Sequence, residues 1–159
     1  MAGARAALLE ELRSLDLPSG AAVAVGPAGK GIDDAPWSLA EARLTLDLPL
    51  GLGGVLDAEV FAVERLAHGA LDAELRERFV VQQLGGVLEH DRVRKSALLR
   101  TLTVWLDSGC NTAQAARELH LERQSMHQRL QRIFELCGGE PRGTGRLAGL
   151  HLATRLAGL

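Results

Sequence analysis

The sequence predicts a mainly α-helical protein with one small strand-helix-strand unit near its amino terminus. From residue 57 onward, apolar residues recur at intervals of three or four, which is the spacing of one helix face. Only two short segments, 21–26 and 54–56, are typical of strands, and a sheet of two strands is a weak core. The 159 residues are enough for one ordinary domain or two small ones, and a content of 47% hydrophobic and 24% charged residues is typical of a globular chain.

The amino-terminal segment predicts four elements in a row. The first residues, MAGARAALLEELRSLDLP, place acidic side chains close to apolar ones, which indicates a short amphipathic helix rather than a signal peptide. A buried strand is expected over 21–26. A helix then follows over SLAEARLTL, with Asp34 or Ser38 as its cap and Pro36 in its first turn. A second strand at 54–56 completes the α/β unit.

Residues 57–91 predict linking helices. One helical stripe contains Val60, Val63 and Leu66/Ala67, and the next contains Leu71, Leu75, Phe79, Leu84 and Val87/Leu88. We expect both helices to connect and pack the parts of the chain. The predicted domains are therefore an α/β segment at 1–56, linking helices at 57–91 and a helical domain at 92–159.

Charge is distributed unevenly along the chain. The net charge is −2, but residues 1–91 hold 7 Lys and Arg against 15 Asp and Glu, whereas residues 92–159 hold 11 against 5. Such asymmetry indicates a nucleic-acid or membrane-surface partner for the basic part. Because no apolar stretch approaches the ~20 residues of a membrane span, we expect a cytoplasmic protein. Its two cysteines, Cys110 and Cys137, are expected to be small buried hydrophobes.

The helical domain starts with one amphipathic helix and a stop. From Arg92, one helix face carries apolar side chains, and Gly109 then supplies a helix end. The residues of this face are Ala97/Leu98, Leu102, Trp105 and Leu106. Asn111 is expected to cap the next helix, with Gln114 reaching back to it in a capping box. Ala115, Ala116 and Leu119 then form the buried side of a short second helix.

A break in helical phase lies at residues 120–122. Met126, Leu130, Ile133 and Cys137 form one stripe with spacings of four, three and four, but this stripe does not continue back to Leu119. The break predicts two helices joined by a turn of three or four residues, which is a helix-turn-helix. His120 occupies the place in this turn where such motifs often have Gly, so a positive φ there would carry strain.

The side opposite the Met126 stripe is polar and suits a DNA major groove. Gln can pair with adenine through two hydrogen bonds, Ser can donate or accept, and Arg can bind guanine edges or phosphates. The helix around 123–137 is therefore the expected reading helix, and the start of the preceding helix suits a phosphate. The residues that we expect to contact DNA are Thr112, Arg123, Gln124, Ser125, Gln128, Arg129 and Arg132. A polar stripe alone is also typical of any surface helix, but the phase break, the Ala115–Ala116 pair and the basic charge favour DNA.

These residues also resemble a known family. AARELHLERQSMHQRLQRI resembles the Fis-type helix-turn-helix, and residues 97–153 resemble the carboxy-terminal domain of the PucR/CdaR family of bacterial transcription regulators. The resemblance includes LLRTLTVWLDSGCN before the motif and RLAGLHLATRL after it. It implies that the acidic half derives from a GGDEF-like domain, since VAVGPAGKGIDDAPWSLAEARLTL and GGVLDAEVF are similar to its final strand-helix-strand part. The family's sensory region and the first half of that domain are missing, so the chain is a compact derivative or a fragment.

The resemblance implies a DNA-binding transcription regulator that binds double-stranded DNA as a homodimer on two half-sites, with no cofactor and no identified small-molecule effector. Glu122, Gln124 and Gln128 stand where the family often has His, Asn and Tyr, so base preference does not transfer. The dimer surface is open: the amino-terminal helix, the helices between residues 60 and 88, and the leucines of LAGLHLATRLAGL are candidates, and these leucines are equally suited to closing the core. The alternative function is a truncated family member that hetero-oligomerises through its acidic half without binding DNA.

Other classes of function fit the sequence less well. The glycines of VGPAGKGID have neither the spacing of a phosphate-binding loop nor the order of a dinucleotide fingerprint, so a plain turn is expected. Cys110, His120, His127 and Cys137 lack the close pairing of a zinc site. Recognition of RNA by stacking is disfavoured by the absence of Tyr. We therefore expect neither an enzyme nor a metalloprotein.

Overall fold

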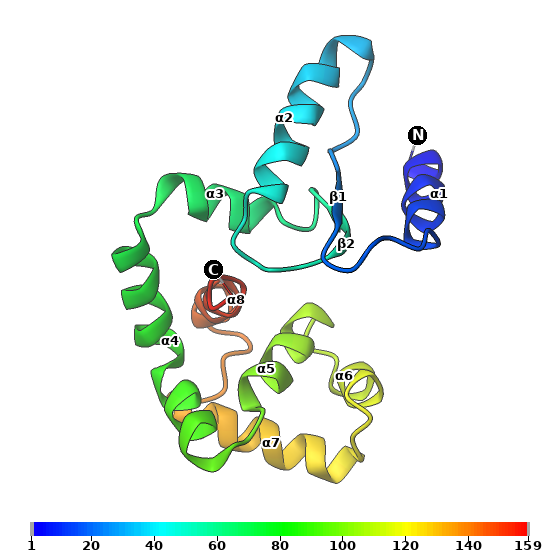
Figure 1. The fold of residues 1–159 in the computed structure, drawn as a ribbon. Coiled ribbons are helices and arrows are strands. Elements are labelled where there is room, and N and C mark those ends of the chain that lie inside the picture. Colours follow the sequence, from blue (N-terminus) through cyan, green and yellow to red (C-terminus); the bar gives the residue numbers. More distant parts are fainter. Residues whose placement is uncertain (1, 159) are drawn as a thin grey trace. The chain divides into compact units, whose positions relative to one another are not determined.

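The computed structural model describes residues 2–158, which form two compact units, residues 2–71 and residues 72–158. This range contains eight α-helices and one parallel sheet of two strands, which confirms the predicted mainly α-helical class (Figure 1). In the described range, no helix combines the length and the apolar character that crossing a membrane requires.

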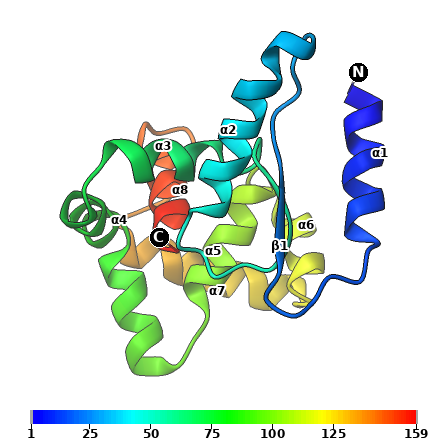
Figure 2. The same ribbon diagram turned by 45° about the horizontal axis from the view of Figure 1, so that its top comes forward.

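The amino-terminal unit is a small α/β arrangement. Its elements are α1 (Ala2–Arg13), β1 (Ala22–Val25), the 3₁₀ helix η1 (Ile32–Asp34), α2 (Ala35–Leu46), β2 (Gly54–Asp57) and α3 (Ala62–Ala70). The two strands pair in parallel, with Ala22 opposite Gly54 and Val25 opposite Asp57. Helix α2 forms the crossover between them and lies beside β1 (Figure 2). The predicted strand-helix-strand unit and the predicted amino-terminal helix are thus confirmed.

The glycine-rich loop after β1 lies very close to α2. A Cβ atom at Gly26 would be 2.2 Å from the Ser38 carbonyl oxygen, and one at Gly29 would be 2.6 Å from the Cβ of Asp34. Only glycine allows these approaches, so the glycines serve the packing of the loop. The loop amides of Ala28 and Lys30 donate to carboxylates of the protein itself, at Glu59 and Asp34. These contacts agree with a plain turn rather than a phosphate-binding loop.

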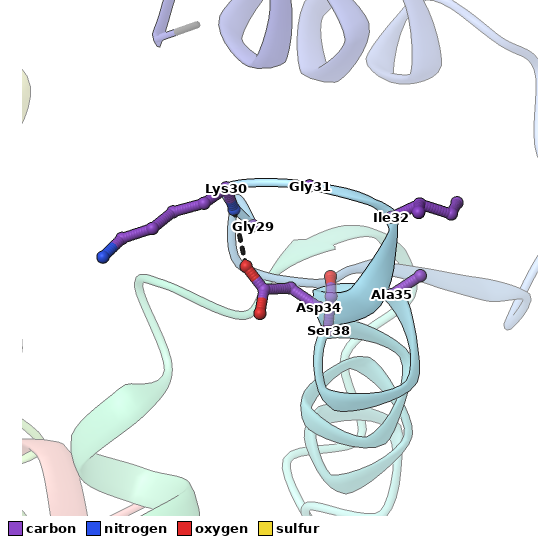
Figure 3. A pocket seen from close by; sticks show the side chains of 7 residues that line it. All are labelled: Gly29, Lys30, Gly31, Ile32, Asp34, Ala35 and Ser38. Carbon is purple, nitrogen blue, oxygen red and sulfur yellow. Dashed lines mark hydrogen bonds between the residues drawn. The ribbon is translucent and has the colours of Figure 1, made fainter.

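The predicted cap of α2 is only partly correct. Pro36 lies in the first turn and Asp34 occupies the cap position, but neither Asp34 nor Ser38 caps the helix with its side chain. The Asp34 carboxylate instead accepts a hydrogen bond from the Lys30 amide at 2.7 Å (Figure 3), and the Ser38 hydroxyl donates to the Pro27 carbonyl at 2.8 Å. The reason is that η1 runs directly into α2, so Asp34 already has helical backbone angles, whereas a capping residue needs an extended backbone.

An arginine whose side chain is largely buried, at 13% exposed, ties α1 to the sheet. The Arg5 guanidinium donates to both carboxylate oxygens of Asp57, at 2.6 and 3.0 Å, and to the Gly26 carbonyl at 3.1 Å. The hydrogen bonds from Arg5 lower the pKa of the Asp57 carboxyl. A bidentate arginine–carboxylate pair fixes the orientation of the two side chains as well as their distance, so it holds α1 against the end of β2.

A second buried arginine joins α3 to α2. The Arg65 side chain is only 8% exposed, and it donates to the Glu41 carboxylate, the Ala58 carbonyl and the Thr45 hydroxyl. Thr45 is itself buried on the inner face of α2. Polar bonds therefore occupy the junction between these two helices, where apolar packing is usual.

Most of the apolar stripe predicted on α3 is exposed, and Ala67 is its buried member. Leu66 is 72% exposed and Val63 is 44% exposed, whereas Glu64 and Ala67 are buried. The helix itself is confirmed, but its rotation follows the bonds of Arg65. Leaving a buried guanidinium unpaired costs more free energy than exposing two aliphatic side chains, so the charged group sets the face.

The carboxy-terminal unit is helical and has an apolar core. Its helices are α4 (Ala73–Arg94), α5 (Leu98–Asp107), α6 (Thr112–Glu118), α7 (Arg123–Leu136) and α8 (Arg146–Leu156). Helix α5 is central, since it contacts the other four (Figure 1). Trp105 is fully buried, and its ring centroid lies 5.4 Å from that of Phe134. The predicted apolar faces are confirmed by burial of Leu98, Leu102, Trp105, Leu106, Ala115, Ala116, Met126, Leu130, Ile133 and Cys137. Two predicted members differ: Leu119 is half-buried, and Ala97, which precedes α5, is exposed.

Helices α4 and α8 close this core. Leu84 and Val87 of α4 are fully buried, as predicted for the second linking stripe, and so is Leu150 of α8. Leu75, the member of that stripe in the first turn of α4, is instead 41% exposed. Gly86 lets α4 approach the end of α7, because a Cβ there would be 2.7 Å from the Leu136 carbonyl oxygen. Of the two roles that the sequence left open for the terminal leucines, Leu150 and Leu156 fill that of closing the core.

The helix that the sequence predicted from Arg92 onward is interrupted. Helix α4 continues to Arg94, Lys95 takes a positive φ of 53°, and α5 begins only at Leu98. The periodicity of apolar residues did not reveal this turn, because the side chains that fix it are polar.

Asp91 holds the turn between α4 and α5. Its carboxylate accepts hydrogen bonds from the amides of Leu98 at 2.8 Å and Leu99 at 2.9 Å, and from the Ser96 hydroxyl. Burial alone would raise the pKa of the Asp91 carboxyl, but these bonds outweigh it and the pKa is lowered. Asp91 thus caps α5 from the last turns of the preceding helix.

Candidate nucleic-acid interface

The turn between α6 and α7 closes around a left-handed residue. His120 has a φ of 52°, its amide donates to the Arg117 carbonyl at 3.1 Å, and the Leu121 amide donates to the Ala116 carbonyl at 2.8 Å. This pair of bonds is a Schellman motif, which normally places Gly at the left-handed position. The predicted break at 120–122 is confirmed, and the left-handed geometry costs a non-glycine residue about 1 kcal/mol or more.

Asn111 and Trp105 position the start of α6. The Asn111 side chain accepts a hydrogen bond from the Gln114 amide at 3.1 Å, which confirms the predicted cap. The reciprocal bond of a capping box, from the Gln114 side chain, is absent among the described residues. Trp105 Nε1 donates to the Thr112 hydroxyl at 3.3 Å. Because a hydroxyl has two acceptor sites and one proton, Thr112 still has its proton for a phosphate.

A groove lies between α6 and α7, and we name it the α6 groove. It is lined by Thr112, Ala113, Ala116, Arg117, Leu121, Arg123 and His127. Arg117 and Arg123 are exposed, and neither side chain has an ion-pair partner among the described residues. This groove therefore combines one hydroxyl with two free positive charges.

A second groove lies between α7 and the start of α5, and we name it the α5 groove. It is lined by Ser96, Leu98, Leu121, Ser125, Gln128, Arg129 and Arg132. The Arg129 guanidinium donates to the buried Thr101 hydroxyl at 3.2 Å, and Arg132 pairs with Glu135 at 3.0 Å. Arg129 is thus half-buried and oriented by α5, whereas Arg132 is exposed.

The predicted contact residues gather on one side of the carboxy-terminal unit. Arg123, Gln124, Gln128 and Arg132 are exposed, while Thr112, Ser125 and Arg129 are half-buried. All except Gln124 line one of the two grooves, and Gln124 is exposed on the helix between them. The polar face of α7 is thus a ridge between two grooves, one of them bordered by α6 and the other by α5.

The predicted contact set missed seven lining residues: Ser96, Leu98, Ala113, Ala116, Arg117, Leu121 and His127. His127 follows Arg123 by one helical turn, so its spacing was a usable signal, and Arg117 similarly follows Ala113 by four residues. Ser96 and Leu98 gave no such signal. They reach α7 only because of the turn between α4 and α5.

The start of α7 is open to an acceptor. Glu122 occupies the cap position in an extended conformation, but its side chain makes no hydrogen bond to the first amides of α7. The first turn of the helix contains no acidic residue either. The first amides and the positive end of the helix dipole are therefore available to a phosphate or to an acceptor on a base edge.

The cysteines and histidines do not form a metal site in the described range, where no group of three or more metal-ligating side chains occurs. Cys137 is buried and Cys110 is half-buried. Burial raises the pKa of both thiols, so they stay protonated and weakly nucleophilic at neutral pH. The free side chains that remain at this site are hydrogen-bonding and cationic groups, which suit a polyanion.

Comparison with known protein families identifies the kind of domain that carries this site. Residues 98–156 match the PucR C-terminal helix-turn-helix domain. The match begins at the first residue of α5 and ends at the last residue of α8, so it includes both helices of the motif. A PucR-type helix-turn-helix implies DNA-binding transcription regulation, and the domain is regulatory rather than catalytic. Neither a curated protein nor a solved structure matches the chain significantly.

Proposed function

We propose that this protein is a sequence-specific transcription regulator that reads the DNA major groove with α7. The observation that carries the proposal is the open, unpaired start of α7, where Arg123 and Gln124 are exposed beside an uncapped helix end. Such motifs present this part of the second helix to base edges. The PucR-type match of residues 98–156 supports the same assignment.

Each side chain has a role in the proposal. Gln124 and Gln128 read bases, since an amide can form two hydrogen bonds with adenine, and Ser125 adds a less selective contact. Arg123 and Arg132 bind guanine edges or phosphates. Arg129, which lines the α5 groove and is oriented by Thr101, adds a third arginine to this surface. Thr112, at the start of α6, donates its hydroxyl proton to a phosphate oxygen.

The proposal also includes the oligomeric state of the protein on DNA and the domain from which its amino-terminal part derives. We infer a homodimer on two half-sites about one helical turn apart, because regulators with this motif generally bind in this way. We also infer that residues 1–56 derive from a GGDEF-like domain, residues 57–91 link it and residues 92–159 bind DNA. The parallel pairing of β1 with β2 around α2 is compatible with that origin. The protein would act in the bacterial cytoplasm.

The test is selection of bound duplexes from a random pool, followed by titration of the enriched duplex by fluorescence anisotropy. We expect an enriched sequence with two related half-sites, and binding that weakens steeply between about 50 and 200 mM salt. Gln128→Ala should lower affinity for the enriched duplex by about 1–3 kcal/mol and relax the preference at one base position.

The matched control is Gln82→Ala, which makes the same change at an exposed position of α4. It should leave both affinity and preference unchanged. Failure of the wild-type chain to bind any duplex at low salt would refute the proposed function. Equal losses in Gln82→Ala and Gln128→Ala would refute the assignment of α7 as the reading helix.

A second candidate function rests on the amino-terminal unit. Trp37, Leu39 and Leu44 of α2 are about half exposed, and Leu66 of α3 is exposed further. Exposed apolar side chains in such number favour a protein partner. The alternative is therefore an interaction module that hetero-oligomerises through this unit without binding DNA, and the anisotropy titration separates the two functions.

A further inference from the structure

The corner between α4 and α5 carries an unused cluster of positive charge. We define the basic corner as Arg92, Arg94, Lys95 and Arg100, which lie within nine residues that contain no Asp or Glu. All four are exposed. Arg92 pairs with Glu89 at 2.6 Å, but Arg94, Lys95 and Arg100 have no ion-pair partner among the described residues. Three of these four positive charges are therefore not neutralised by an ion pair in the described part of the chain.

The basic corner borders the reading helix. Ser96 and Leu98, which belong to the same turn, line the α5 groove together with Gln128 and Arg132 of α7. Arg117 and Arg123 line the other groove, beside α6. Cationic side chains of the α6 groove thus lie on one side of α7, and the turn that carries the basic corner lies on the other. The turn between α4 and α5 lies outside the helix-turn-helix motif, which accounts for α6 and α7 alone.

The basic corner is also held in place. The Asp91 carboxylate binds the amides of Leu98 and Leu99 and the Ser96 hydroxyl, so the turn is fixed by three hydrogen bonds. Lys95 sits at a φ of 53°, where Gly or Asn would be less strained. A fixed corner presents its charges without first ordering a flexible arm, which would cost entropy on binding.

The geometry points to contact between the basic corner and a DNA phosphate backbone. A major groove is about 12 Å wide and is bounded by one phosphate strand on each side. A helix lying in it therefore meets two rows of negative charge. We propose that Arg94, Lys95 and Arg100 bind the strand on the α5 side, while Arg117 and Thr112 bind the strand on the α6 side. This inference rests on the proposed function, since it assumes that α7 enters the groove.

The experiment measures the salt dependence of binding to the enriched duplex for a charge-removing pair, Arg94→Ala/Lys95→Asn. Asn tolerates the positive φ at position 95, so the turn is kept. Each lost phosphate contact lowers the slope of log affinity against log salt by about 0.9, so the double variant should lose about 2. Base preference should be unchanged, because phosphates carry no sequence information.

The matched control is Arg78→Ala, another exposed arginine of α4, which pairs with Glu74 at 3.6 Å. It lies 16 residues before Arg94, or about 24 Å along the helix axis, and should leave the slope unchanged. Arg100→Gln provides a second variant on α5, with an expected slope loss of about 1. Circular dichroism of each variant checks that its helices remain intact.

The outcomes separate this inference from the proposed function. A wild-type slope in the double variant and in Arg100→Gln would overturn the inference while the proposed function stands. A changed base preference in these variants would also overturn it, since it would indicate base contact instead. No binding by the wild-type chain would overturn both. A reduced slope in the corner variants, with Arg78→Ala unchanged, supports the inference.

Discussion

The two units of this protein are stabilised in different ways. In the carboxy-terminal unit, all five helices bury apolar side chains, and α5, which carries the fully buried Trp105, contacts the other four. In the described part of the amino-terminal unit, Leu9, Leu48 and Leu56 are the buried aliphatic side chains larger than Ala. Two arginine networks, centred on Arg5 and Arg65, hold the helices of that unit instead.

The exposed surfaces differ in the same sense. Of the fourteen large hydrophobic side chains that are exposed, eleven belong to residues 2–71 and three to residues 72–158. The carboxy-terminal unit thus buries its own apolar residues and exposes polar and basic ones. The amino-terminal unit does the reverse at α2 and α3, which is typical of a surface that another chain covers. The two units therefore differ both in what stabilises them and in the kind of surface that they expose.

Removing the central side chain should break the carboxy-terminal unit. We expect Trp105→Ala to lower the free energy of unfolding of this unit by about 3–5 kcal/mol. The truncation removes apolar contacts between α5 and α7 and leaves a cavity in the core. Each unit contains one tryptophan, Trp37 or Trp105, so fluorescence reports on them separately. The Trp105 signal of Trp37→Phe gives the reference stability of this unit. Because Trp105→Ala lacks that signal, its unfolding is followed by far-ultraviolet circular dichroism. A loss below about 1 kcal/mol, from the far-ultraviolet circular dichroism of Trp105→Ala in urea, would contradict an apolar core centred there.

Removing a charge should break the amino-terminal unit. We expect Arg65→Ala to lower its free energy of unfolding by about 3 kcal/mol, because the buried side of the Glu41 carboxylate loses its partner. The double variant Arg65→Met/Glu41→Leu removes both charges and should recover most of that loss. The measurement is urea unfolding followed by Trp37 fluorescence in a Trp105→Phe background. If the double variant is no more stable than Arg65→Ala, packing rather than charge holds α3 in place.

Acid should weaken both units through one carboxylate each. The pKa values of Asp57 and Asp91 are lowered in the folded chain. Their contribution to stability is therefore fully present above the pKa of the unfolded chain, near 3.8, and is lost as the pH falls through the lower folded value. Asp57→Asn should flatten this decline in the Trp37 signal and Asp91→Asn in the Trp105 signal, each at a cost of about 2 kcal/mol at pH 7. If neither variant changes the loss of stability at low pH, other titrating groups cause that loss.

Relieving the turn of the motif should have the smallest effect. We expect His120→Gly to raise the stability of the carboxy-terminal unit by up to about 1 kcal/mol, because Gly has no Cβ to strain at a φ of 52°. His127→Gly makes the same chemical change inside α7 and should lower stability by about 1 kcal/mol. Thermal unfolding of both variants should therefore shift in opposite directions. A lower melting temperature for His120→Gly would mean that its imidazole stabilises the turn.

Much of the carboxy-terminal unit was predictable because the signals that mark its helices come from residues close together in the sequence. A capping residue, a Gly stop and a stripe of apolar residues each depend on neighbours within a few positions, so Asn111, Gly109 and the Met126 stripe marked their helices correctly. The break at His120 was found in the same way, from two apolar phases that do not join. The parallel strand pair was predictable too, from two short apolar runs on either side of a helix.

The features that sequence reasoning missed depend on polar contacts between distant residues. The rotation of α3 follows the bonds of Arg65 to Glu41, which is 24 positions away. The end of α4 and the start of α5 follow from Asp91, which binds amides seven and eight positions later. Apolar periodicity contains no information on such bonds, because the energy of a buried charge depends on which partner reaches it in space.

The sequence by itself determined the helical class, the phase break and the polar face of α7, because these follow from the period of the α-helix and from side-chain chemistry. The tertiary structure alone decided which side chains flank that face. Arg94 and Lys95 gain their proposed role from the turn that brings Ser96 beside Gln128, 32 positions along the chain. Their charge is written in the sequence, but its use depends on position in space, since electrostatic attraction falls with distance.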